Sequence, residues 1–176
     1  EEIRLDTLLA IPDVQNMAAM LVDPTGKGLE DHWSKAAFAM LGGAILHCCI
    51  MTRHAQKRTA TLYDLSCMLA DESRTIQDLF KEMVAAPHAD LLKSIFPNGE
   101  GGDKAHTFIA SSAREMLNKA ENDTSDSMQS TYTHLFSFIR ILQEIFSGIR
   151  PVKSTRIRGH CWYICWYGFG AHSAAM

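Results

Sequence analysis

Apolar residues recur along most of this chain at the spacing of one helix face. The first such segment runs from residue 13 to residue 22, with apolar side chains at i, i+3, i+4 and i+7: Val14, Met17, Ala18 and Leu21. This repeat is typical of an amphipathic helix with one side buried. A residue before proline avoids the α conformation, so Asp23, which precedes Pro24, is expected to end the helix.

A long apolar segment follows and is expected to form a helix over about residues 31–53. It carries no formal charge between residues 36 and 51. A membrane span needs about 20 apolar residues, whereas this stretch has 16 residues and includes His47. The pattern therefore favours a central helix that is buried on most sides. Gly42 and Gly43 would let a neighbouring helix approach it closely.

Five further helices are expected along the chain. Thr61 and Thr75 each have an aspartate three residues later, which is the arrangement of a capping box at a helix start. The five expected helices cover about residues 61–70, 75–85, 89–95, 104–121 and 125–147. There is no convincing strand before residue 150. The sequence therefore predicts an all-α fold, a compact bundle of about seven helices around the buried central one.

Residues 148–176 do not continue the helical pattern. The stretch "CWYICWYGF" alternates aromatic and other residues, which favours an extended conformation. Four side chains there are of metal-ligating types: His160, Cys161, Cys165 and His172. Their spacing fits no common zinc module, so no metal site is expected. We assign residues 1–147 to the all-α domain and expect the tail to be vector-derived sequence or an out-of-frame end.

Composition and charge narrow the class of protein. Apolar residues make up 47% and charged residues 21% of the chain, as in ordinary globular domains. All 20 acidic residues lie at or before Glu144, so the body is net acidic, which disfavours a dedicated DNA-binding surface without excluding a local basic patch. Cys48 and Cys49 sit in an apolar helical run and suit reduced thiols in a cytosolic protein. The chain starts without Met or a signal peptide, so we expect an excised fragment.

The turn around Lys27 invites comparison with a phosphate-binding loop. A Walker A loop follows a strand and places Ser or Thr after its lysine. Here Gly28 follows Lys27, and Leu21, five residues before Gly26, lies in the first predicted helix. We therefore interpret the stretch as a helix stop, a two-glycine turn and a helix start, with no nucleotide site.

A basic cluster, defined as Arg53, His54, Lys57 and Arg58, follows the central helix. One interpretation is a contact for nucleic-acid phosphate or for an acidic protein. The other is the favourable placement of cations at a helix C-terminus. Both interpretations stay open. Lys27, Lys104 and the polar residues near it are further candidate contacts, because loops on a rigid bundle often carry recognition. No catalytic, cofactor-binding or metal-binding residues are expected.

Several separated segments resemble one protein family in the order in which they occur. They read "DVQNMAAMLVDPTGKGLEDHWSKAAFAMLGGAILH", "ATLYDLSCMLAD" and "AREMLNKAENDTSDSMQSTYTHLFSF". Over about residues 1–140 the chain resembles the all-α domain of type IV secretion coupling proteins, the TraG/TraD-like conjugation ATPases.

The resemblance implies a role within a larger parent protein. That parent would be a hexameric ATPase of the bacterial inner membrane, with an N-terminal anchor and a RecA-like motor that uses ATP and Mg²⁺. The all-α domain would face the cytoplasm, without membrane contact, and recognise a relaxase, a relaxosome or a secreted protein. This chain lacks the Walker segments, so it is expected to be neither an ATPase nor to hold a cofactor. Two alternatives are binding of single-stranded DNA by the basic cluster and an unrelated protein-interaction domain. A free-standing small enzyme is the least favoured hypothesis.

Overall fold

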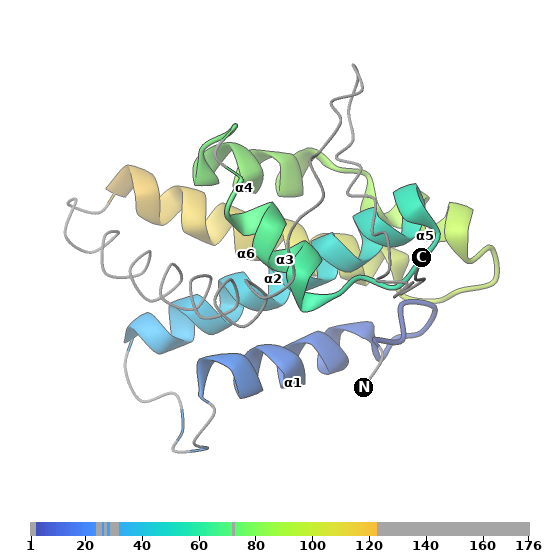
Figure 1. Ribbon diagram of the computed structural model, residues 1–176, viewed down its shortest axis with the longest axis horizontal. Coiled ribbons are helices and arrows are strands. Elements are labelled where there is room, and N and C mark those ends of the chain that lie inside the picture. Colours follow the sequence, from blue (N-terminus) through green and yellow to red (C-terminus); the bar gives the residue numbers. More distant parts are fainter. Residues whose placement is uncertain (1–2, 24–25, 27, 29–31, 72, 123–176) are drawn as a thin grey trace, which may run out of the picture.

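A computed structural model shows an all-α architecture (Figure 1). The structure describes residues 3–23, 26, 28, 32–71 and 73–122. Within these residues there are six helices and no strand: α1 (Ala10–Val22), α2 (His32–Gln56), α3 (Leu62–Leu69), α4 (Ile76–Ala85), α5 (His88–Ile95) and α6 (Gly102–Asn122). They correspond to the first six helices predicted from the sequence, which confirms the all-α prediction. The predicted helix at 125–147 and the tail at 148–176 lie outside the described residues.

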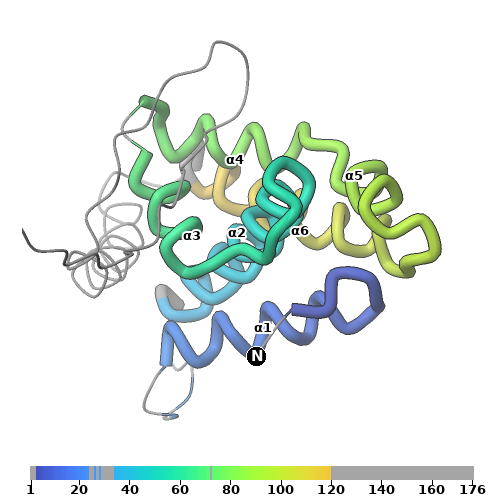
Figure 2. The backbone as a smooth tube through the Cα atoms, turned by 45° about the vertical axis from the view of Figure 1, so that its right-hand side comes forward, coloured from blue at the N-terminus to red at the C-terminus, as the bar shows by residue number. Residues whose placement is uncertain are grey.

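The central position predicted for the second helix is confirmed. α2 contacts α1, α3, α5 and α6, and Figure 2 shows α1 on one side of it and α4 on the other. Every residue from 40 to 50 is buried. The stretch Ser34–Gln56 is long and apolar enough to cross a membrane, yet 72% of its most apolar window is buried inside the bundle. This burial is the property of a core helix.

The two glycines of α2 mark its closest approach to α6. The helices run in opposite directions side by side (Figure 1). A Cβ atom on Gly43 would stand 2.8 Å from Cβ of Ser112, and one on Gly42 would stand 3.3 Å from the ring of Phe108. The predicted close helix–helix approach at Gly42 and Gly43 is therefore confirmed, and α6 is the partner.

Both predicted capping boxes are present. The Thr61 hydroxyl accepts a hydrogen bond from the Asp64 amide at 3.3 Å, and the Asp64 carboxylate accepts one from the Thr61 amide at 2.7 Å. Thr75 and Asp78 repeat this exchange at 3.2 Å in both directions. These reciprocal bonds satisfy amides that have no partner within the first helical turn, so α3 and α4 begin where the sequence indicates.

The first helix begins earlier than predicted. α1 starts at Ala10 because Pro12 falls in its first turn, where a missing amide hydrogen costs nothing. The preceding segment folds back onto it, and the Arg4 side chain donates to the Asp13 carboxylate at 2.9 and 2.6 Å. The predicted end at Asp23 is confirmed, since this residue is the C-cap of α1.

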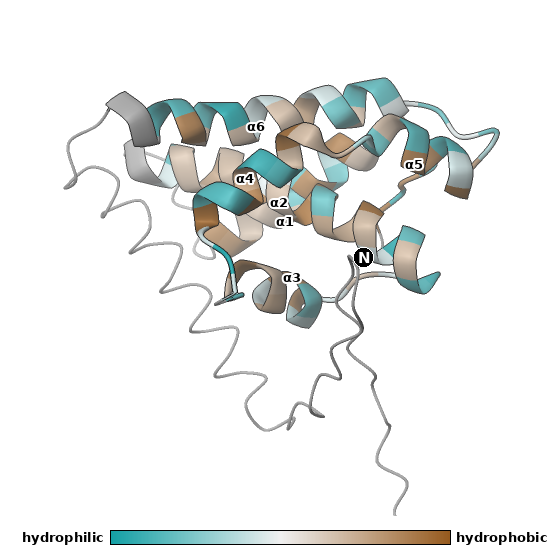
Figure 3. Cartoon of the chain, turned by 90° about the horizontal axis from the view of Figure 1, so that it is seen from above, coloured by the Kyte–Doolittle hydropathy of each residue, from teal (hydrophilic) through white to brown (hydrophobic). Residues whose placement is uncertain are grey.

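Hydrophilic residues gather on the outward side of the bundle, most visibly along α6 (Figure 3). All six described helices contribute side chains to the core, with Phe80, Leu46 and Ile109 among those that are fully buried. The surface between α2 and α3, at the end of α2, is the part on which the candidate site lies.

Candidate functional site

The basic cluster splits into two parts with different surroundings. Arg58 donates to both oxygens of the Asp64 carboxylate at 2.7 and 2.6 Å, and also to the side chain of Gln56 at 2.8 Å. The Asp64 hydrogen bond raises the pKa of Arg58, and despite its partial burial Asp64 has a lowered pKa because Arg58 and Thr61 hydrogen-bond its carboxylate. Arg58 therefore fixes the loop between α2 and α3.

The other three members of the cluster, unlike Arg58, form no ion pair with a described carboxylate. The Arg53 guanidinium lies over the Phe96 ring, 5.8 Å from its centroid, a cation–π arrangement. His54 and Lys57 are exposed. Lys57 has a positive φ of 57°, the left-handed conformation that commonly ends a helix. Among the residues that the structure describes, none of these three side chains has a carboxylate within ion-pair distance.

A cavity of about 400 Å³ lies beside Arg53 and is called here the α2–α3 cavity. Its walls come from residues 3–6, α1, α2, the loop before α3, α3 itself and Phe96, and they are mostly apolar. Three charged side chains line it: Arg4, Asp6 and Arg53. Arg4 is engaged by Asp13, whose pKa its hydrogen bonds hold below the usual value. No sequence pattern indicates this cavity, because its walls come from segments far apart along the chain.

The cysteines in the cavity wall are not poised for covalent chemistry. Cys48 and Cys49 are buried, unpaired thiols, as the sequence predicts. Burial raises the pKa of Cys49 to about 12 and that of Cys48 further still. Because the thiolate is the nucleophile, both remain unreactive thiols near neutral pH. No group of three metal-ligating side chains is assembled in the described part of the chain.

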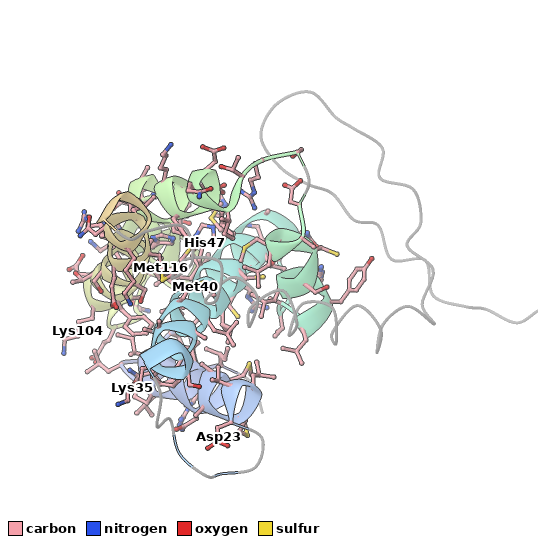
Figure 4. All side chains as sticks on the ribbon, turned by 90° about the vertical axis from the view of Figure 1, so that its left-hand side faces the viewer. Asp23, Lys35, Met40, His47, Lys104 and Met116 are labelled. Carbon is pink, nitrogen blue, oxygen red and sulfur yellow. The ribbon has the colours of Figure 1, made fainter. Side chains whose placement is uncertain are left out.

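The remaining predicted contacts do not join this site. Lys104 is exposed at the start of α6 (Figure 4), where it lines a separate shallow depression with Ile11 and Phe108. Lys27 lies outside the described residues. The turn around it supports the interpretation as a helix stop, because the Gly28 amide donates to the Asp23 carboxylate at 2.5 Å. A carboxylate that occupies a turn amide would repel a bound phosphate.

Three histidines, which no sequence pattern had indicated, form a chain from α2 through α5 to α6. Nδ1 of His47 in α2 lies 2.8 Å from Nε2 of His88 in α5, and Nδ1 of His88 lies 3.2 Å from Nδ1 of His106 in α6. Nε2 of His47 lies 3.8 Å from a Glu82 oxygen of α4, and Glu82 pairs in turn with Arg74.

The histidine chain can be hydrogen-bonded throughout with a neutral ring at His88. If His106 donates to His88 and His88 donates to His47, each nitrogen of the His88 ring has a partner while that ring stays neutral. Burial, followed by the neighbouring His47 and His106, lowers the pKa of His88 to about 3. The chain thus connects α2, α5 and α6 through the neutral ring of His88, and His47 also approaches Glu82 of α4. Its members lie 41 and 18 residues apart, so no local pattern reveals it.

Comparison with known proteins identifies the family of the chain. The family model described as Type IV secretory system Conjugative DNA transfer matches residues 1–145. Two relatives, both conjugal transfer protein TraG of Escherichia coli, are 38% and 35% identical over 135 residues. The aligned region is 77% of this chain and 19% of each relative, so the chain spans about a fifth of their length. No solved structure matches significantly.

The family match and the fold agree with the resemblance read from the sequence. The matched residues include all six helices, the glycine turn and both capping boxes. The chain therefore belongs to the family of type IV secretion proteins for conjugative DNA transfer, with TraG among its relatives.

Proposed function

We propose that this domain is the substrate-recognition module of a conjugative coupling protein. It docks a relaxase, a relaxosome or a secreted protein by surface contacts and performs no chemistry on it. One observation carries the proposal: the half-buried Arg53 lines an open apolar cavity, and neither Arg53 nor the exposed Lys57, four residues later, has a carboxylate partner among the described residues. A pre-formed cavity with charge at its mouth suits recognition.

In this proposal the recognition domain and the ATP-driven motor are separate parts of a larger parent protein. The parent is a hexameric, membrane-anchored ATPase of the inner membrane, and its motor uses ATP and Mg²⁺. The present domain faces the cytoplasm and selects what the motor moves. Its lack of a pre-activated thiolate at the cavity wall, and the carboxylate of Asp23 in the glycine turn, support a binding role over a catalytic one. Measurable ATP turnover by this chain would contradict that assignment.

A pull-down tests the docking role. The full chain, immobilised on resin, is incubated with the purified relaxase of the same conjugative system at low salt. We expect the relaxase to be retained above a bare-resin control, while an unrelated acidic protein is not retained. Failure to recover the relaxase alone or assembled on its origin DNA would count against the proposal.

Single-stranded DNA is the second candidate ligand, favoured by the basic cluster. Each phosphate neutralised by a cation releases counterions, so such binding weakens steeply as salt rises. Anisotropy of a labelled oligothymidylate would measure this slope. If reversal of Arg53 and Lys57 to glutamate leaves the affinity unchanged, the basic cluster is not a DNA site.

A further inference from the structure

We propose that the α2–α3 cavity takes an apolar side chain of the docked protein and that Arg53 pairs with a carboxylate beside that side chain. The recognised chemistry is an extended segment in which a large apolar residue adjoins Asp, Glu or a free C-terminus. This inference rests on the proposed docking function and specifies where and how the segment is held.

The size and walls of the cavity suit an apolar side chain. Its volume of about 400 Å³ falls within the range of about 300–1,000 Å³ found for ligand pockets. Ile45 and Leu65 form a buried part of the wall, and Leu62 and Phe96 are half-buried beside them. An apolar group that enters this space leaves water and gains contacts with all four.

The charges at the cavity favour an acidic neighbour for that side chain. Two arginines line the cavity, and Arg4 already donates to Asp13 at 2.9 and 2.6 Å. The Arg53 guanidinium lies over the Phe96 ring and has no carboxylate within ion-pair distance among the described residues. A guanidinium without a carboxylate partner has N–H groups that can bind a carboxylate in a bidentate manner. Lys57, one helical turn further on, adds a second positive charge.

Asp6 provides a second test of the proposal, because its carboxylate would repel a negatively charged ligand. Its side chain also lines the cavity and is exposed. A carboxylate on the docked segment is attracted by Arg53 and repelled by Asp6. Neutralising Asp6 should therefore strengthen the binding that reversal of Arg53 weakens. An opposite pair of signs would mean that the segment is basic.

Nucleic acid fits this cavity less well than a protein segment. Affinity for single strands depends on several phosphate contacts along a basic groove. Here Arg53, which has no carboxylate partner in the described part of the chain, lines an apolar space together with the carboxylate of Asp6. The cavity therefore selects for an apolar group with one adjoining negative charge.

Selection from a random peptide library on the immobilised full chain tests the proposal. We expect enrichment of peptides with a large apolar residue next to Asp, Glu or a free C-terminus. The best peptide, labelled for fluorescence anisotropy, should bind Arg53→Glu about tenfold more weakly or worse, since a charge-assisted pair is lost. It should bind Asp6→Asn more tightly. Lys93→Glu, an exposed charge on α5 that does not line the cavity, should bind as the parent chain does. Enrichment of basic peptides, or of none, would overturn the proposal.

A cavity-filling variant tests the apolar half of the inference. Ala60 lines the cavity and is only half-buried, so Ala60→Phe places a ring in that space. Peptide binding should be lost while the circular dichroism spectrum and melting temperature are kept. If Ala60→Phe does not fold, Leu62→Asp, which makes the wall polar, takes its place. An oligothymidylate that displaces the peptide from the parent chain, and still binds the filled variant, would identify a nucleic-acid surface and overturn the proposal.

The two proposals fail in distinguishable ways. If the unsubstituted chain and both variants, Ala60→Phe and Arg53→Glu, retain the relaxase equally, the docking role stands and the cavity is not its site. If the unsubstituted chain binds the selected peptide but never the relaxase, the cavity is a binding site and the relaxase is not its ligand.

Discussion

The buried imidazole of His88 makes the stability of the fold depend on pH. Its pKa is about 3 in the folded chain and about 6.5 when unfolded. The unfolded state therefore gains a proton as the pH falls below 6.5, while the folded state does not. Between pH 6.5 and pH 5 this difference removes up to about 2 kcal/mol from the free energy of unfolding. Urea unfolding at the two pH values measures the loss.

A matched variant isolates this effect from other titrations. His88→Gln should flatten the pH dependence between pH 6.5 and pH 5, whereas His54→Gln, at an exposed position, should leave it unchanged. The carboxylates with lowered pKa values, such as Asp64 and Glu82, start from 3.8 and 4.5 and act at lower pH. An unchanged pH profile in His88→Gln would show that another group controls the acid instability.

The two capping aspartates should differ in how much they stabilise the chain. Asp64 caps α3 and also binds Arg58, and its side chain is 9% exposed, whereas Asp78 caps α4 with a side chain that is 51% exposed. Asp64→Ala removes a cap and leaves Arg58 without its partner, at a cost of roughly 2–4 kcal/mol. Asp78→Ala should cost clearly less. Denaturant unfolding of both variants checks the order, and equal losses would show that the Arg58 pair adds nothing.

Local signals of this kind explain what the sequence could predict about single residues. A capping box spans four consecutive residues, so the motifs at Thr61 and Thr75 predict the starts of their helices without knowledge of the fold. The uncommitted state of Arg53 and the engagement of Arg58 depend on Phe96 and Asp64, which neighbour them only in the folded chain. The sequence therefore named the basic cluster but did not separate its two parts.

The crossing of α2 and α6 depends on one glycine more than on the other. Gly43→Ala would bring Cβ within 2.8 Å of Cβ of Ser112, which the backbone of α6 holds in place. Even after a helix-propensity gain of up to about 1 kcal/mol, we expect a net loss of roughly 1–2 kcal/mol. Gly42→Ala meets only the end of the Phe108 ring at 3.3 Å, so it should be neutral or stabilising.

Thermal unfolding of the two alanine variants measures this difference directly. A lower melting temperature for Gly43→Ala alone is the expected result. If Gly43→Ala is as stable as Gly42→Ala, α6 must shift away easily, and the close approach is not a requirement of the fold. The presence of a close neighbour was predictable from the paired glycines in an apolar run. Its identity was not, because three other helices lie between α2 and α6 along the chain.

The bundle as a whole decides whether α2 is a core helix or a membrane helix. Composition alone permits both, since Ser34–Gln56 has the length and hydropathy of a span. Packing discriminates between them, because His47 bonds to His88 and approaches Glu82 from the interior. Moving α2 into lipid would break these contacts and leave polar groups without partners, which is costly in hydrocarbon. The short charge-free stretch and His47 favoured the core from the sequence, and the tertiary contacts supply the reason.

Hydrogen exchange provides the corresponding test for the whole molecule. We expect the amides of residues 40–50, all buried, to exchange only through global unfolding and therefore to be the slowest in the chain. Amides of α3, a short helix that packs mainly on α2, should exchange faster through local opening. Lipid vesicles added to the chain should leave both rates unchanged, because the apolar side chains of α2 already have protein partners. Rapid exchange along α2 that slows on addition of vesicles would show that this helix leaves the bundle for the membrane.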